Sequence, residues 1–289
     1  MKKIIKFFIF HLQRQVKIYS LRNIIAHIQS IFRKKHVIDG ASDLFNINNE
    51  LEKSRELIKN GYTELGLIDN TDVIDKIIAK SNKLKVFNPF AEEKVKYNLN
   101  DIPVDARQAM FSRNDLVQID EVLQIANDPS ILRIVEGFLL TTPTISNINM
   151  WWSIPREGKA QNAQLFHRDV DDIKFCKLFI YLTDVGENDG PHTFVRGSTS
   201  SNKLTYIKRY SDDEIIESFG KQNIITFQRP KYSCFLVNTY GFHKGTPPLD
   251  SNRLLLQVQY SINPIGIENY TPVKLKHNYN RFINRLILK

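Results

Sequence analysis

The spacing of the apolar residues changes near residue 145, and this change limits the folds that the chain can adopt. Upstream, segments such as 71–80 repeat valine and isoleucine at the spacing of one helix face. From Ile145 onward, apolar residues alternate with polar ones at the period of a strand. Helices followed by short strands predict a mixed α+β chain, mainly β, whose second half is a sandwich or a barrel.

Most of the elements can be placed from this periodicity and from the residues at their ends. Helices are expected at 48–60, 71–80, 120–126, 129–139 and 211–219. The last of these begins with Ser-x-x-Glu, the capping box that starts many helices. Strands are expected from residue 145 onward and at 175–182, 232–237 and 253–262.

The last expected strand has two different faces. Leucine, valine, tyrosine and isoleucine occupy the even positions from 254 to 262. Arg253, Gln257 and Gln259 share the other face with Leu255, because successive side chains of a strand point to opposite sides. The polar face either meets solvent or, in a small barrel, points arginine and glutamine into a ligand cavity.

The charge of the chain is concentrated at its two ends. The first 38 residues carry nine Lys and Arg and no acid, which accounts for the whole net charge of +9. A second basic stretch, 269–289, also lacks acidic residues. The sequence therefore predicts a basic amphipathic helical extension (1–48), a main domain (49–268) and a basic tail (269–289). The main domain is mildly acidic, so nucleic acid is not expected as a partner.

Two interpretations of the basic ends remain open. The longest apolar run there spans only residues 7–10, much less than the roughly 20 residues of a membrane span. The extension is expected either to cap the body or to lie on an anionic membrane surface. The only two cysteines, Cys176 and Cys234, cannot build a disulfide framework. We therefore expect a cytoplasmic protein, with peripheral contact to the inner face of a membrane as the alternative.

Four residues form a candidate site for metal chemistry. His167 and Asp169 would share one face of a strand and could bind one ion together. His243 and Arg253 follow at the edges of later strands. Two histidines and one carboxylate are the ligand set of non-haem Fe(II) oxygenases, which leaves three positions for a chelating co-substrate and O₂. Arginine suits the distant carboxylate of such a co-substrate. A His-x-Asp pair alone is common, so the spacing by itself is a weak signal.

Two segments resemble a known family. They are FHRDVDDIKFCKLFIYLTDVGENDGPHTFVRGS, which begins at Phe166, and NTYGFHKGTPPLDSNRLLLQVQYS, which begins at Asn238. In order, they contain His-x-Asp, a strand ending in Leu-Thr-Asp-Val, an Asn-Asp-Gly-Pro turn, a Gly-Ser pair, a second histidine, and an arginine before an apolar strand. This ordered set resembles the phytanoyl-CoA dioxygenase family of Fe(II)/2-oxoglutarate oxygenases, over about residues 50–265.

The resemblance implies a double-stranded β-helix (a jelly roll, cupin-like) with flanking helices. It implies that His167, Asp169 and His243 bind Fe(II) and that Arg253 binds the distal carboxylate of 2-oxoglutarate, with O₂ as the second co-substrate. It also favours hydroxylation of an unactivated C–H bond, because related halogenases replace the carboxylate that Asp169 retains here.

Other residues are less firmly aligned with the family. Met150, Phe179 and Arg113 fall where the family places residues around 2-oxoglutarate, although the family commonly has tryptophan near Phe179. His192, in a turn, is expected at the surface or beside the ligands rather than among them. Asp171 and Asp172 are expected in a solvated loop, with contact to the substrate as the alternative because they follow the metal pair. The long polar stretch 203–229 could form a lid.

The substrate is not fixed by these features, because one fold serves many chemistries. A small molecule, a lipid or a glycan-linked compound would each be compatible, and the basic ends hint at a substrate near a membrane. Two rival functions also remain. One is a jelly-roll module that binds a ligand and keeps the metal site without turnover. The other is a cupin-type metal enzyme that does not use 2-oxoglutarate, against which Arg253 argues.

Overall fold

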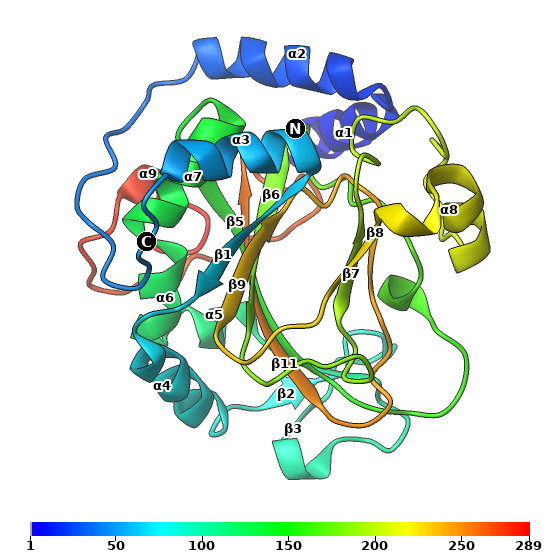
Figure 1. The fold of residues 1–289 in the computed structure, drawn as a ribbon. Coiled ribbons are helices and arrows are strands. Elements are labelled where there is room, and N and C mark those ends of the chain that lie inside the picture. Colours follow the sequence, from blue (N-terminus) through cyan, green and yellow to red (C-terminus); the bar gives the residue numbers. More distant parts are fainter. Residues whose placement is uncertain (1) are drawn as a thin grey trace.

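The computed structural model describes residues 2–289, with side chains from Phe7 onward. Figure 1 shows helices gathered above and beside a twisted sheet. The helices are α1 (Lys2–Gln15), α2 (Tyr19–Ile31), α3 (Glu50–Asn60), α4 (Thr71–Ser81), α5 (Arg113–Leu116), α6 (Asp120–Ala126), α7 (Pro129–Leu139), α8 (Asp212–Phe219) and α9 (Arg281–Asn284). Short 3₁₀ turns occur at η1 (Leu99–Asp101), η2 (Asn162–Gln164) and η3 (Lys221–Asn223).

The strands form two antiparallel sheets. They are β1 (Tyr62–Leu67), β2 (Val86–Phe87), β3 (Lys96–Tyr97), β4 (Gln108–Phe111), β5 (Thr144–Ser153), β6 (Phe175–Tyr181), β7 (His192–Val195), β8 (Ile224–Phe227), β9 (Ser233–Val237), β10 (His243–Gly245) and β11 (Arg253–Ser261). The larger sheet has the order β1-β9-β6-β11-β5-β4-β2-β3, and the smaller one has the order β10-β7-β8. Within residues 2–289 the strands pair as two sheets and not as one closed barrel.

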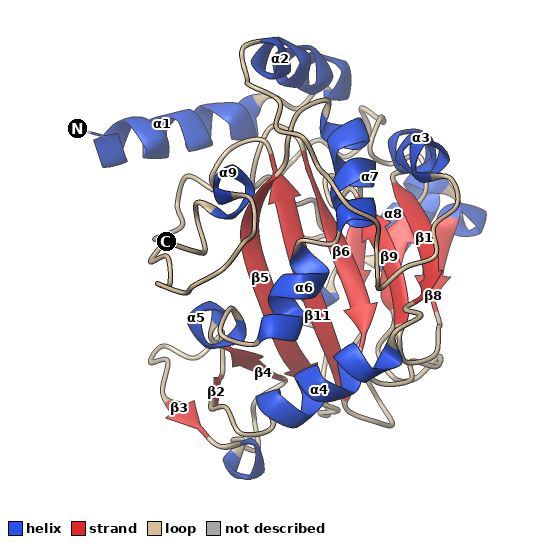
Figure 2. Cartoon of the chain, turned by 90° about the vertical axis from the view of Figure 1, so that its left-hand side faces the viewer, coloured by secondary structure: helices blue, strands red, loops and turns tan. Residues whose placement is uncertain are grey.

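The two faces of the large sheet have different partners. The outer face, with Leu256 and Val258 of β11, belongs to the main hydrophobic core. Figure 2 shows α4, α6 and α7 lying across this face. The inner face packs against the small sheet, where Phe235 of β9 stacks on Phe227 of β8 with ring centroids 4.3 Å apart. A mixed α/β chain with a large antiparallel sheet facing a smaller one agrees with the expected jelly roll.

Three of the expected helices, α3, α7 and α8, begin with a side-chain cap. The Asp128 side chain accepts a hydrogen bond from the backbone of Ile131, and Pro129 occupies the first turn of α7. The capping box predicted at Ser211 is present at the start of α8. Gly61 ends α3 with a positive φ of 83°, and a Cβ there would meet the Phe194 ring. The predicted segments 120–126 and 129–139 coincide with α6 and α7.

Both chain ends pack on the body. Ala26 of α2 belongs to the main core, as do Ile283, Ile287 and Leu288 of the C-terminal tail. The two ends of the tail lie side by side, since Val273 forms a parallel bridge with Leu288. None of the described helices is both long and apolar enough to cross a membrane.

Candidate metal centre and cavity

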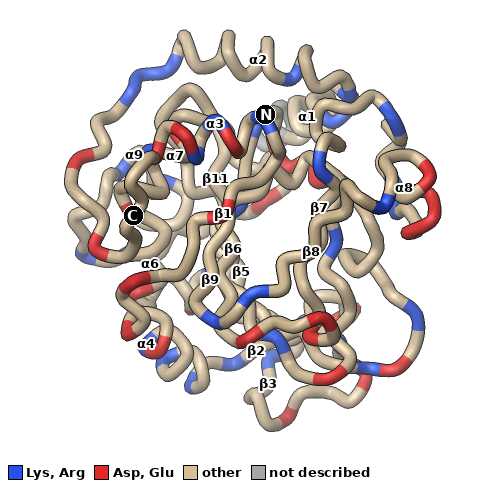
Figure 3. The backbone as a smooth tube through the Cα atoms, in the orientation of Figure 1, with Lys and Arg blue, Asp and Glu red and all other residues tan. Residues whose placement is uncertain are grey.

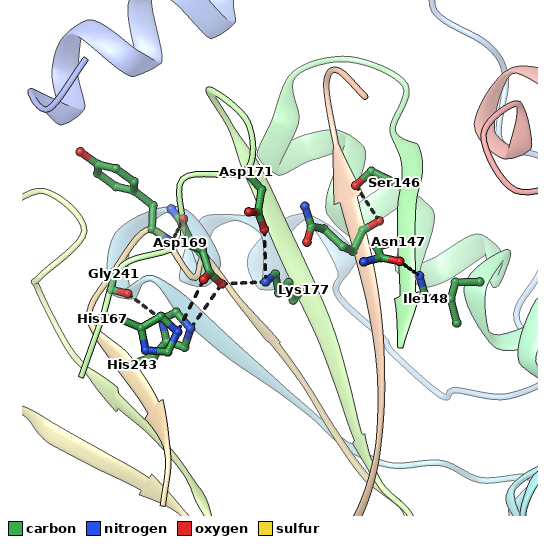
Figure 4. A network of polar contacts seen from close by, with 12 residues as sticks. Ser146, Asn147, Ile148, His167, Asp169, Asp171, Lys177, Gly241 and His243 are labelled. Carbon is green, nitrogen blue, oxygen red and sulfur yellow. Dashed lines mark hydrogen bonds and ion pairs between the residues drawn. The ribbon is translucent and has the colours of Figure 1, made fainter. Parts of the chain in front are cut away.

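His167, Asp169 and His243 lie together, although 74 residues separate the last two in the sequence. His167 pairs with His243 through two backbone hydrogen bonds of 3.0 Å, and the Asp169 amide donates to the Thr239 carbonyl at 2.9 Å. One ligand atom from each of the three side chains lies within 4.8 Å of the other two. Figure 4 shows the two imidazoles and the carboxylate pointing toward one another.

The backbone orients both histidine rings. Nδ1 of His167 lies 2.9 Å from the Leu165 carbonyl, and Nδ1 of His243 lies 3.0 Å from the Gly241 carbonyl. A carbonyl oxygen only accepts hydrogen bonds, so each Nδ1 donates a proton to it, and each Nε2 is the ring nitrogen left to bind a metal. Burial, followed by the neighbouring His243, lowers the pKa of His167 to about 3. His167 is therefore neutral and suited to bind a metal.

The two Nε2 atoms face the carboxylate of Asp169. They lie 3.6 Å from Oδ1, for His167, and 3.3 Å from Oδ2, for His243. Two imidazole nitrogens and the Asp169 carboxylate therefore face the same point, and each of these groups can donate an electron pair to a metal. A divalent cation placed between them would satisfy all three, so the donor set and its orientation fit a bound metal.

A lysine neutralises the carboxylate from the other side. Nζ of Lys177, on β6, lies 2.6 Å from Oδ2 of Asp169 and 3.4 Å from Oδ2 of Asp171. Burial alone would raise the pKa of Asp169, but Lys177 and then His243 hold this pKa well below its usual range. For Lys177, burial is outweighed by Asp169 and Asp171, so its pKa is raised. Both groups are therefore charged and form a buried ion pair.

A cavity of about 340 Å³ opens beside the three ligands, between the two sheets. Its apolar wall includes Trp151, Phe179 and Leu255 of the large sheet. Its polar wall includes four amide side chains, from Gln108, Asn149, Gln164 and Gln257. The inner face of β11 therefore lines a cavity. This was one of the two predictions for the strand, the other being that its polar face meets solvent.

Arg253 lies at the inner part of the cavity wall and is 3% exposed. Its guanidinium donates to the Ser153 hydroxyl at 2.9 Å and to the Gly190 carbonyl, while its Nε has no partner. The backbone at Gly190 has a φ of +75°, and a Cβ there would lie 2.6 Å from the Thr246 carbonyl oxygen. Glycine at this turn therefore lets the chain lie close to the backbone at Thr246 and Pro248.

The structure brings only some of the predicted co-substrate residues to the cavity. Phe179 lines it, in stacking contact with Phe235. Met150 points to the opposite face of β5 and packs in the main core, because its neighbours Asn149 and Trp151 take the cavity side. Arg113 is also away from the cavity. It forms an ion pair with Glu268 at 3.2 Å.

His192 lies beside the ligands, which was one of its two expected positions, and not at the surface: it is 4% exposed and lines the cavity with its ring 4.6 Å from that of Phe179. The expectation of a solvated loop was wrong for Asp172, which is fully buried and accepts hydrogen bonds from Asn263 and the Ile173 amide. Burial, the largest cause, raises the pKa of Asp172 to about 6.

Lys177 and Arg209 are cavity residues that the sequence pattern did not reveal. Lys177 falls in an apolar run, where one charged residue gives no sign of its partner. Arg209 belongs to the long polar stretch that could form a lid. Within residues 7–289, whose side chains the structure describes, no ion pair involves Arg209, so this cavity residue is a cation without a directly bonded acidic partner.

No protein family profile matches the sequence, and no curated protein matches it. Solved structures do match. The crystal structure of HygX from Streptomyces hygroscopicus with nickel and 2-oxoglutarate bound has 14% sequence identity and a TM-score of 0.52, over 80% of this chain and 92% of HygX. HygX with hygromycin B also bound matches with the same identity and TM-score, over 78% of this chain and 90% of HygX.

A second enzyme gives a similar match. The epimerase SnoN, in complex with Fe³⁺, α-ketoglutarate and nogalamycin RO, has 15% identity and a TM-score of 0.51. The match covers 73% of this chain and 82% of SnoN. Identities this low show the fold and not the activity. The chain therefore has the fold of these iron- and 2-oxoglutarate-binding enzymes, with a His-Asp-His cluster that can hold a metal ion.

Proposed function

We propose that this protein is an Fe(II)- and 2-oxoglutarate-dependent dioxygenase that hydroxylates a C–H bond of a small molecule. The observation that carries the proposal is the convergence of His167, Asp169 and His243 beside a cavity that also contains a buried arginine. The metals and 2-oxoglutarate found in HygX and SnoN, which share the fold, support it.

His167, Asp169 and His243 would hold the metal and would leave coordination positions for 2-oxoglutarate and O₂. When bound there, Fe(II) and 2-oxoglutarate supply the oxidising chemistry: O₂ is reduced, 2-oxoglutarate becomes succinate and CO₂, and one oxygen atom enters the substrate. The task of the chain is to hold these groups in place and to limit access of water. Cavity volume and lining residues suit a small co-substrate next to a small substrate.

Five cavity residues have specific roles in this proposal. Arg253 would bind the distal carboxylate of 2-oxoglutarate, because its guanidinium is buried and its Nε has no partner. Lys177 holds Asp169 so that the carboxylate faces the histidines. Trp151, Phe179 and Leu255 form an apolar wall that excludes water near the metal.

Two features bear on reaction and substrate. Asp169 keeps a metal-binding carboxylate, which favours hydroxylation over halogenation. The amides of Asn149 and Gln257, which can donate and accept hydrogen bonds, favour a substrate with hydroxyl or other polar groups. A glycan-linked compound or a lipid with a polar head would present such groups, and the hygromycin B bound to HygX is a small-molecule precedent on this fold.

The cysteines support a cytoplasmic location. Cys176 and Cys234 are both free and buried. Burial raises the pKa of both thiols, so neither is a reactive thiolate. A chain that gains nothing from disulfides is suited to a reducing compartment.

The test is an anaerobic titration of the purified protein with Fe(II) and then with 2-oxoglutarate, followed by visible absorption. We expect a weak metal-to-ligand charge-transfer band that needs both additions and is absent from His167→Ala. A folded protein that binds iron but shows no band with 2-oxoglutarate would refute the dioxygenase. A cupin-type enzyme or a binding module that keeps the metal site would then be favoured.

A further inference from the structure

Helix α2 packs on the body with its polar side. The three buried residues of this helix are Arg22, Ala26 and Ser30, which follow one another at intervals of four. A helix on the surface of a soluble domain normally buries its apolar stripe instead. The orientation of α2 is therefore inverted with respect to the body.

The outward face of α2 is an aliphatic stripe. Leu21, Ile24, Ile28 and Ile31 are 43%, 56%, 49% and 65% exposed, and their spacing of three, four and three places them on one side of the helix. Phe32, directly after the helix, is 84% exposed and continues the stripe. Figure 1 shows α2 at the edge of the molecule, with no other element covering its outer side.

Specific contacts of Arg22 hold the helix in this orientation. Its guanidinium donates to the carbonyls of Asp172, Val16 and Gln13, and lies 4.1 Å from the centre of the Tyr240 ring. Turning α2 to bury the aliphatic stripe would break all of these contacts. The exposure of the stripe is thus built into the fold.

The segment that carries the stripe has only basic charges, while Glu50 of α3 and Glu136 of α7 line the pocket beside Ile31. No acidic residue occurs before Asp39, while Lys34 and Lys35 follow the helix and are exposed. Figure 3 shows basic and no acidic residues along α1, α2 and the start of the loop that follows. Helix α1 repeats the combination, since Phe8 and Leu12 are also exposed on a segment with basic residues only.

We propose that the stripe on α2 (Leu21, Ile24, Ile28, Ile31 and Phe32) docks on an anionic lipid surface. An apolar face on a segment whose charged residues are all basic is the combination that enters the headgroup region of such a bilayer, where Lys34 and Lys35 would meet lipid phosphates. A symmetric dimer through the same face would instead oppose two positively charged segments, because a two-fold interface brings each patch against itself.

The docking segment also contacts the loop after the predicted ligand Asp169. Gln13 of α1 donates to the Asp171 carbonyl at 3.2 Å, and Arg22 of α2 donates to the Asp172 carbonyl. The proposal does not depend on the proposed dioxygenase activity, because it needs neither the metal nor the cavity.

The test is co-sedimentation of the full chain, without iron, with vesicles of phosphatidylcholine alone or mixed with phosphatidylglycerol. We expect binding only to the anionic vesicles, reduced at high salt and by Lys34→Gln/Lys35→Gln. Ile24→Gln/Ile28→Gln should lower the bound-to-free ratio by about tenfold or more. The matched control is Val95→Gln/Val104→Gln, two exposed valines elsewhere, which should bind like the wild type.

Three outcomes would overturn the proposal. One is the absence of binding to anionic vesicles at low salt. Another is equal binding by the Ile24→Gln/Ile28→Gln variant and the wild type, which would place the contact elsewhere. The third is a wild-type dimer in sedimentation velocity that this variant converts to a monomer, which would show that a second copy covers the stripe. Circular dichroism of each variant confirms that it is folded.

Discussion

Lys177 and Asp169 form a buried ion pair, with Nζ 2.6 Å from Oδ2, at the inner edge of the candidate metal centre. The carboxylate thus has a positive partner on one side and two imidazoles on the other. This arrangement keeps Asp169 ionised before any metal arrives and limits its rotation. It also means that the strand β6, and not only the ligand-bearing loop, determines the geometry of the centre.

Lys177→Met should destabilise the metal-free protein and should increase the rise in Tm that a bound metal causes. Removing one partner of a buried pair typically costs about 3–5 kcal/mol, because the remaining charge is left uncompensated. A divalent cation can replace the lost charge, so Mn(II) should raise the Tm of the variant more than that of the wild type. Lys174→Met is the control, since no ion pair involves Lys174 within residues 7–289. Equal responses to Mn(II) in Lys177→Met and the wild type would contradict this account.

Replacing any of the three predicted ligands by alanine should remove metal binding. Loss of an outer neighbour of a ligand already costs about 10–100-fold in affinity, so loss of His167, Asp169 or His243 itself should cost more. Calorimetric titration with Mn(II) measures this, and succinate formation should disappear in parallel. His27→Ala, at an exposed position on α2, should behave like the wild type. A ligand variant with full succinate production would show that the assignment is wrong.

Arg253→Ala should raise the KM for 2-oxoglutarate. Truncating one partner of a desolvated, hydrogen-bonded charge pair costs about 2–5 kcal/mol, which corresponds to at least about 30-fold in affinity. Arg253→Lys should recover only part of this, because lysine cannot form the two parallel hydrogen bonds. Mn(II) affinity measured without 2-oxoglutarate should stay unchanged in both variants. An unchanged KM would mean that another group binds the carboxylate.

The long helices and strands and the three metal ligands could be predicted because residues close together in the sequence indicate each of them. The boundaries of α6 and α7 follow from apolar spacing and from the cap at Asp128 and Pro129. The two-faced character of β11 follows from alternation alone. The ordered motifs around His167 and His243 predicted that these residues would meet, and the structure brings them together.

The rest depends on pairing between distant segments. β7 and β10 have only four and three residues, too few to show a period, and they exist because they pair with each other. The same pairing buries His192, which a Pro-His turn alone would place at the surface. The inward position of Lys177 likewise depends on where the loop after Asp169 folds back, which no single segment specifies.

His192→Phe should stabilise the ligand-free protein and should reduce the stabilisation that 2-oxoglutarate gives. Nε2 of His192 is buried without a partner, although the ring lies 5.6 Å from that of His243 and lines the cavity. Phenylalanine keeps the contact with Phe179 and removes a group whose unmet hydrogen bond costs about 1–3 kcal/mol. The ligand-free protein should therefore melt at a higher temperature, while 2-oxoglutarate should raise the Tm less than in the wild type. A lower Tm without ligand would show that His192 stabilises the fold itself.

Lys174 should make stability depend on pH in the alkaline range. Burial, the main cause, lowers the pKa of Lys174 from 10.5 to about 8, and its Nζ lies 4.9 Å from the centre of the Phe138 ring. Between about pH 8 and pH 10.5 the folded state therefore holds fewer protons than the unfolded state, so this group favours folding increasingly as the pH rises. Below pH 8 the penalty for burying the ammonium is fully present. Lys174→Met should remove it and increase the free energy of unfolding at pH 7 by roughly 1–3 kcal/mol, with the gain shrinking toward pH 10. Urea denaturation of both proteins at pH 7 and pH 10 measures this difference, and a gain that did not shrink would show that packing and not charge is responsible.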